Sequence, residues 1–156
     1  YTFDAALTKA LLASGLMLPA QGAVLFSVAD RDKPEALPIM RKFASIGYKL
    51  FATEGTASMI SAAKLPVTTI TKKLNEGHPN VIDVILDGTV NGVVNTITGG
   101  SVPFRDGFNI RRAAAEKRIP CYTSLDTVRA VADALTNGGN AYNAQPLPDY
   151  RNKEPR

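Results

Sequence analysis

The stretch LFATEGTAS, residues 50–58, joins two kinds of sequence pattern. Its apolar start has the length of a strand, Thr53 ends that run, and Glu54 and Gly55 form a turn before a helix opens at Thr56. A strand that leads directly into a helix is half of a βα unit, and a chain that repeats this unit builds a parallel sheet. The stretch therefore predicts an α/β domain if the unit recurs.

The unit does recur along the chain. The run at 23–28 is apolar throughout, which is typical of a central strand covered on both faces. In the helix that follows it, Asp32 is expected at the N-cap, Pro38 in the first turn and Gly47 at the end. Five such strands with right-handed crossovers predict a three-layer, doubly wound α/β domain. The strands are expected at 23–28, 48–53, 67–71, 92–97 and 119–123, and the helices within 29–47 and near 56–64, 79–87, 106–117 and 124–137.

Segments outside these units define the expected domain boundaries. Residues 3–18 show helical spacing and stop at Gly15 and Pro19, so residues 1–19 are interpreted as a lead-in helix and linker from an upstream domain. Residues 20–138 form the α/β domain. Residues 139–156 are rich in Pro and polar side chains and are expected to form a flexible tail. Because the chain begins at Tyr1 rather than Met, we interpret it as a fragment or a processed product.

Composition limits the classes of function. With 45% hydrophobic and 21% charged residues, a chain of 156 residues is expected to fold as one globular domain. Its single cysteine excludes an internal disulfide and a multi-cysteine zinc site, and no apolar stretch reaches the roughly 20 residues of a membrane span. We therefore expect a cytoplasmic protein. The net charge of +4 is scattered along the chain, which favours small anions over nucleic acid as partners.

The residues just after the predicted strands are small and polar. In a parallel sheet these positions meet at one edge, where ligands bind. Glycines, hydroxyls, lysines and helix N-termini together suit a phosphate, although each threonine or glycine taken singly is equally an ordinary cap or turn residue. Glu54 is expected to point away. The set comprises Ser27, Lys33, Thr53, Gly55, Thr56, Lys73, Asn95, Thr96, Thr98, Gly99, Gly100, Thr123 and Ser124.

Residues that could support catalysis are few. No Ser-His-Asp set, Cys-His pair or pair of carboxylates stands at the strand ends, so the pattern favours a pocket that binds without reacting. His78 is interpreted as a turn or cap residue and Cys121 as a small hydrophobe in a buried strand. Asp83 and Asp87 are expected to be exposed on one helix face. Arg111 and Arg112 are interpreted as a solvated helix face, from which one of them could reach a neighbouring surface.

Five blocks in order carry a family resemblance: LFSVADRDK, KLFATEGTA, KKLNEGHPNVID, VVNTITGG and FNIRRAAAEKRIPCYTSL. Residues 20–137 resemble the methylglyoxal-synthase-like domain family, and most closely its branch at the C-terminus of carbamoyl-phosphate synthase large chains. The lead-in segment also resembles the link between that domain and the preceding ATP-grasp half of those enzymes. The resemblance implies a sheet in the order 3-2-1-4-5 and a regulatory site for a nucleoside monophosphate, UMP or IMP. It assigns the ligand contacts to Lys33, Thr53, Thr56, Lys73, Asn95, Thr96 and Thr98, and a possible ornithine contact to Cys121 and Thr123.

The same resemblance implies the wider context of the domain. The parent would be a glutamine-hydrolysing, ATP-dependent ligase that uses ATP, Mg and K and supplies carbamoyl phosphate to pyrimidine and arginine synthesis. The partners would be the rest of the large chain and the small glutaminase subunit, and this chain itself would hold no cofactor, no metal and no catalytic residue. The alternative is a lyase that acts on dihydroxyacetone phosphate in the same pocket, with Glu76 or Asp83 as the base.

Overall fold

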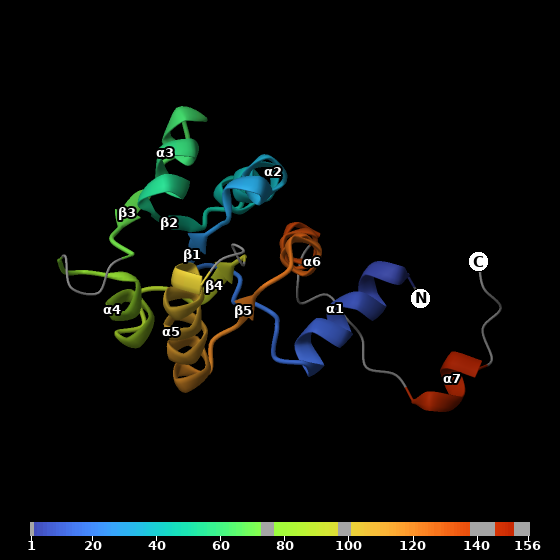
Figure 1. The fold of residues 1–156 in the computed structure, drawn as a ribbon. Helices are drawn as coiled ribbons and strands as arrows, with labels where there is room; N and C mark the ends of the chain where they lie inside the picture. Colours follow the sequence, from blue (N-terminus) through green and yellow to red (C-terminus); the bar gives the residue numbers. More distant parts are fainter. Residues whose placement is uncertain (1, 73–76, 97–100, 138–145, 152–156) are drawn as a thin grey trace.

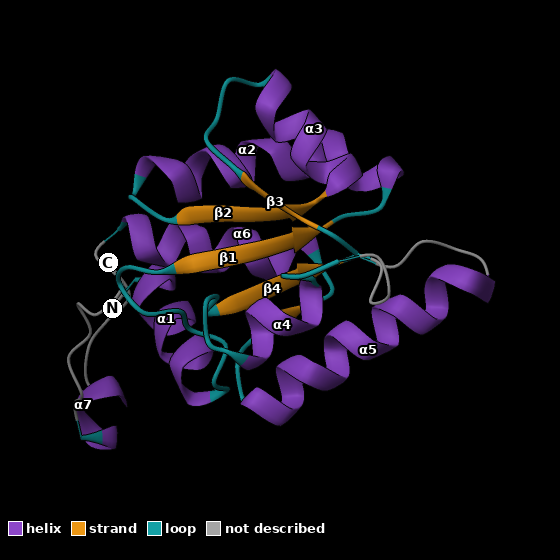
Figure 2. Cartoon of the chain, turned by 90° about the vertical axis from the view of Figure 1, so that its left-hand side faces the viewer, coloured by secondary structure: helices purple, strands orange, loops and turns teal. Residues whose placement is uncertain are grey.

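A computed structural model of the chain describes residues 2–72, 77–96, 101–137 and 146–151, without the side chains of 101–106, 150 and 151. It contains a five-stranded sheet in the order β3-β2-β1-β4-β5, in which all neighbours are parallel. The predicted doubly wound fold and the implied strand order are therefore confirmed. Figure 2 shows β1, β2 and β4 pointing in the same direction, so their carboxyl ends share one edge.

The observed elements follow the predicted order. The strands are β1 (Ala23–Ser27), β2 (Lys49–Thr53), β3 (Thr68–Ile70), β4 (Gly92–Asn95) and β5 (Cys121–Tyr122). The helices are α1 (Phe3–Ala13), the 3₁₀ turn η1 (Asp30–Asp32), α2 (Lys33–Ser45), α3 (Glu54–Ala62), α4 (Val81–Leu86), α5 (Ser101–Lys117), α6 (Leu125–Thr136) and α7 (Leu147–Arg151). Within the part of the chain that the structure describes, no helix has the length and apolarity of a membrane span.

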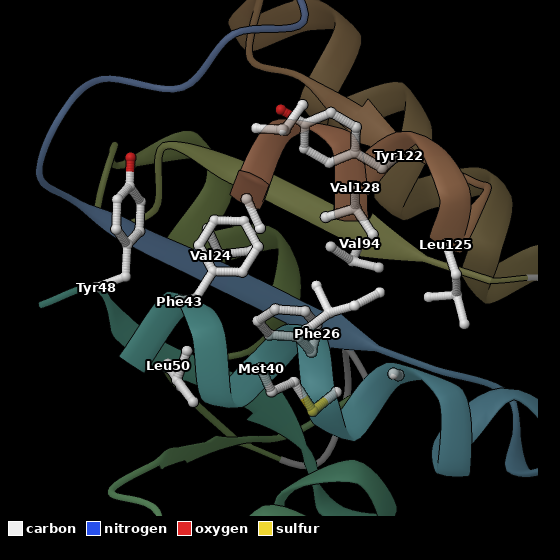
Figure 3. Close-up of a cluster of buried hydrophobic side chains, with 14 of the residues drawn as sticks. Val24, Phe26, Met40, Phe43, Tyr48, Leu50, Val94, Tyr122, Leu125 and Val128 are labelled. Carbon is white, nitrogen blue, oxygen red and sulfur yellow. The ribbon is translucent and has the colours of Figure 1, made fainter. Parts of the chain in front are cut away.

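Helices cover both faces of the sheet, as Figure 1 shows. One apolar cluster joins the sheet to α1, α2, α3 and α6, and a second joins it to α4 and α5. Every residue of β1 is buried, which agrees with its apolar run and its central place. In the first cluster, the rings of Phe26 and Phe43 pack edge to face with centroids 6.1 Å apart, and Phe43 packs similarly on Tyr48 at 5.3 Å (Figure 3).

Several predicted boundaries are wrong by a few residues. Helix α3 begins at Glu54, not Thr56, and α5 begins at Ser101, about one turn earlier than predicted. Asp32 does occupy the N-cap of α2 but makes no capping hydrogen bond, because η1 leads the backbone into the helix instead. Pro38 lies inside α2 rather than in its first turn, so packing against the sheet overrides the lost backbone hydrogen bond.

The segment before β1 packs into the core of the domain. Leu11 of α1 and Leu18 both belong to the first apolar cluster and are about 95% buried. Two tyrosine hydroxyls hold the same segment. Tyr122 of β5 donates a hydrogen bond to the carbonyl of Leu16 at 2.5 Å. Tyr48, just before β2, donates one to the carbonyl of Pro19. The predicted tail contains the short helix α7, and most of the remaining tail lies outside the described residues.

Candidate functional site

A pocket of about 220 Å³ opens at the carboxyl edge of the sheet. Its walls come from the segments after four strands: residues 27–30 and Lys33 after β1, residues 53–56 after β2, Lys72 after β3 and Thr96 after β4. The strand order reverses between β1 and β4, and the edge beside such a reversal is where open α/β sheets bind ligands. The sequence analysis predicted this edge.

Two threonine hydroxyls fix the loop that follows β1. Thr56 Oγ1 accepts a hydrogen bond from the amide of Val28 at 3.2 Å, and Thr96 Oγ1 accepts one from the amide of Ala29 at 2.8 Å. All these groups are buried, so the bonds tie the loop to the first turn of α3 and to the residue that follows β4. Because each hydroxyl accepts in these bonds, its own hydrogen can still be donated to a ligand.

The N-terminus of α3 faces the pocket. Thr53 stands at its N-cap, but its side chain makes no capping hydrogen bond, so the hydroxyl is not committed to the helix. Amide groups in the first turn of a helix have no carbonyl partner within it and attract anions. Thr53 and Thr56 thus line the pocket at an anion-attracting helix end.

Gly55, in the first turn of α3, lies close to the ammonium of Lys33. A Cβ atom built on Gly55 would lie 3.3 Å from Lys33 Nζ, tighter than an ordinary contact. The missing side chain therefore lets the lysine approach the helix end. Both features concentrate positive potential in the pocket.

Replacing Gly55 with alanine is expected to weaken phosphate binding several-fold, because the methyl group displaces Lys33 Nζ and covers the helix end. Stability to urea should stay unchanged or rise by up to about 1 kcal/mol, since alanine favours a helix interior over glycine. Calorimetric titration with inorganic phosphate and urea unfolding test the two effects. Ser58→Ala, on the exposed side of α3, is the control. A loss of stability in step with the loss of affinity would contradict this interpretation.

Among the described residues, four that line the pocket are charged: Lys33, Lys72, Asp30 and Glu54. Lys33 Nζ lies 2.6 Å from Asp30 Oδ1. The hydrogen bond from Lys33, together with its charge, holds the pKa of Asp30 below its usual range, so this carboxylate is ionised at neutral pH. The described lining residues therefore balance two positive charges with two negative ones.

Glu54 does not point away as predicted. Its side chain lines the pocket and Oε1 accepts a hydrogen bond from the hydroxyl of Thr71 at 2.8 Å. Thr71 directly follows β3, so this bond connects the start of α3 to the next strand. The early start of α3 explains the error, because it places Glu54 in the first helical turn rather than in a free loop.

Asn95 is separated from the pocket. Its side chain is buried, donates to the carbonyl of Ser27 at 3.4 Å and accepts from Arg111 of α5 at 3.1 Å. Asn95 is not among the pocket-lining residues, whereas Thr96 is. Arg111 is partly buried rather than part of a solvated face, while Arg112 forms an exposed pair with Glu116. Gly107 leaves room for the arginine, since a Cβ there would lie 3.0 Å from Arg111 Nη1.

The remaining predicted site residues fall into two groups. Lys73, Thr98 and the alternative base Glu76 fall outside the described residues. Cys121 is half-buried rather than fully buried, and burial raises the pKa of its thiol, while Thr123 is exposed. Neither residue lines the pocket.

The other candidate base, Asp83, has a structural role. Its carboxylate accepts from the amide of Asn80 at 2.9 Å and completes a capping box at the start of α4. His78 Nδ1 lies 2.5 Å from the same carboxylate. The bond from Asn80, followed by that from His78, lowers the pKa of Asp83. A carboxylate engaged in this way is a poor proton acceptor.

Asp30 and Lys72 line the pocket but were not among the site residues predicted from the sequence. A signal for Asp30 was its spacing, three residues before Lys33, which brings two side chains together on a helical turn. The alternation of side chains along a strand could have drawn attention to Lys72 beside Lys73, but the irregular backbone after β3 gives no basis for choosing between them. Among the described residues, no group of three potential metal ligands occurs.

Comparison with known proteins supports a family assignment. Residues 35–123 match the family model described as the MGS-like domain. The chain is 47% identical, over 153 residues, to part of a carbamoyl phosphate synthase large chain from Thermomicrobium roseum; the match covers 98% of this chain and 14% of that protein. The crystal structure of ForH covers 82% of this chain and 84% of its own, with 20% identity and a TM-score of 0.57, and is similar in fold.

Proposed function

Since the chain belongs to the family of MGS-like domains, we propose that it is a regulatory module that binds a nucleoside monophosphate. The observation that carries the proposal is the pocket at the carboxyl edge, where Lys33, the Thr53 and Thr56 hydroxyls and the N-terminus of α3 converge. Phosphate oxygens accept hydrogen bonds from all of these groups. UMP and IMP are the proposed ligands.

The identity to a large-chain segment supports a regulatory role within a larger enzyme. The chain spans only 14% of that relative, and we propose that it controls an ATP-dependent carbamoyl-phosphate synthase in the cytoplasm. The rest of the large chain and the glutaminase subunit would then be its partners, and ATP, Mg and K would serve the parent enzyme. Ornithine is a second candidate effector, with Cys121 and Thr123 as its proposed contacts.

Recognition without reaction fits the described chemistry. Lys33 and Lys72 would neutralise the phosphate, while Thr53 and Thr56 would donate hydrogen bonds to it. Asp83, a candidate base for the lyase alternative, is committed to capping α4. An effector bound here would regulate the parent by its difference in affinity for two conformations of the enzyme, commonly about 1–3 kcal/mol.

Calorimetric titration of the chain with UMP, IMP, ornithine and dihydroxyacetone phosphate tests the proposal. We expect saturable binding of at least one nucleotide and no turnover of the triose phosphate. Methylglyoxal formation from dihydroxyacetone phosphate, measured in parallel, would identify the lyase alternative. Absence of nucleotide binding at millimolar concentration, together with binding of the triose phosphate, would refute the regulatory assignment.

A further inference from the structure

Lys33, the lysine that is proposed to bind the phosphate, already forms an ion pair with an acidic side chain, Asp30. Asp30 Oδ1 lies 2.6 Å from Lys33 Nζ, and both residues line the pocket. The lysine side chain is only 21% exposed, whereas the aspartate is 91% exposed. The carboxylate therefore reaches from solvent to a largely enclosed cation at the pocket wall.

The positive character of this wall explains why a counter-charge is present. Lys33 Nζ lies beside Gly55 at the N-terminus of α3, where the helix dipole is also positive. Two positive features at one point are mutually unfavourable unless an anion lies between or beside them. Glu54 accepts a hydrogen bond from Thr71, while Asp30 bonds directly to the lysine.

We propose that Asp30 is an internal competitor: its carboxylate holds Lys33 at the pocket wall and must be displaced by an incoming phosphate. This inference rests on the proposed function, which places a phosphate in the same pocket. Breaking the Asp30–Lys33 pair costs the same for every anion. The pair therefore lowers affinity for all of them by one factor, which keeps abundant weak anions such as chloride out. A ligand with further contacts to Thr53 and Thr56 still binds.

The competitor is tested by titrating the chain with inorganic phosphate. Asp30→Asn is expected to bind phosphate roughly three- to ten-fold more tightly, the range that removal of one solvent-screened charge supports. Asp32→Asn is the matched control, because it changes the net charge by the same amount. Asp32 pairs with Arg31 at 3.5 Å, makes no capping bond and does not line the pocket. The control should stay within about two-fold of the parent chain, since Asp32 pairs with Arg31 whereas Asp30 pairs with Lys33.

Combining Asp30→Asn with Lys33→Ala tests whether the gain in affinity depends on Lys33. If Asp30 acts by holding Lys33, Asp30→Asn should give no gain in affinity when Lys33 is already alanine. Equal affinities for Asp30→Asn and Asp32→Asn, no phosphate binding by Asp30→Asn, or a gain that persists without Lys33 would each overturn the inference.

Titration with UMP separates this inference from the proposed function. Tighter phosphate binding by Asp30→Asn together with no UMP binding by any variant would support the competitor and refute the nucleotide assignment. Normal UMP binding with no effect of Asp30→Asn on either ligand would do the reverse.

Discussion

Replacing Lys33 with alanine is expected to weaken the binding of UMP and of inorganic phosphate by about 10- to 150-fold, or 1.5–3 kcal/mol. The ammonium is largely enclosed at the pocket wall, so water screens its attraction for a phosphate only in part. Isothermal calorimetry at fixed ionic strength measures the effect.

Lys42→Ala is the matched control for this variant. Lys42 lies on the same helix and is also paired with an acid, Asp133 of α6, but it does not line the pocket. It should leave phosphate affinity unchanged. Equal binding by Lys33→Ala and the parent chain would remove Lys33 from the site.

Leu18→Ala is expected to destabilise the chain by about 2–5 kcal/mol, although Leu18 precedes the first strand and lies in the predicted linker. Its side chain is 4% exposed and packs in the larger apolar cluster against β4. The substitution removes buried methyl groups and leaves a cavity in the core. Urea unfolding measures the change in stability, and Leu147→Ala, at a residue that is 67% exposed, should be nearly neutral.

A double-mutant cycle with Gly92 isolates the contact between Leu18 and β4. A Cβ on Gly92 would lie 2.6 Å from Leu18 Cδ2, so Gly92→Ala alone should destabilise the chain by about 1–3 kcal/mol. In the Leu18→Ala background the same change should cost much less, because the clashing methyl group is gone. Additive effects, or a Leu18→Ala variant as stable as the parent, would mean that the lead-in does not form part of the folded core.

The fold was accessible from the sequence because hydrophobic patterning reports burial directly. The run at 23–28 predicted a strand covered on both faces, and β1 is buried at every residue and central in the sheet. Helix starts were less accurate. The early start of α3 depends on how the backbone leaves β2 at Thr53 rather than on side-chain pattern.

The site was only partly accessible. Lys33, Thr53, Thr56 and Thr96 do line one pocket, since the carboxyl ends of parallel strands converge. Asn95 directly precedes Thr96 in the sequence yet bonds to Arg111 instead of lining the pocket. Successive residues of a strand point to opposite faces of the sheet, so two adjacent polar residues need not share a site.

The sequence by itself determined the order of strands and helices along the chain, the central buried strand and the edge of the sheet at which the pocket opens, because these follow from local periodicity and from the geometry of parallel sheets. Only the tertiary structure decided how the charges at that edge pair and which side chains enter the pocket. It brought Lys33 beside Gly55, hydrogen-bonded Glu54 to Thr71 and packed Leu18 into the core. Such contacts depend on distances of a few ångströms between segments, which no pattern along a single chain encodes.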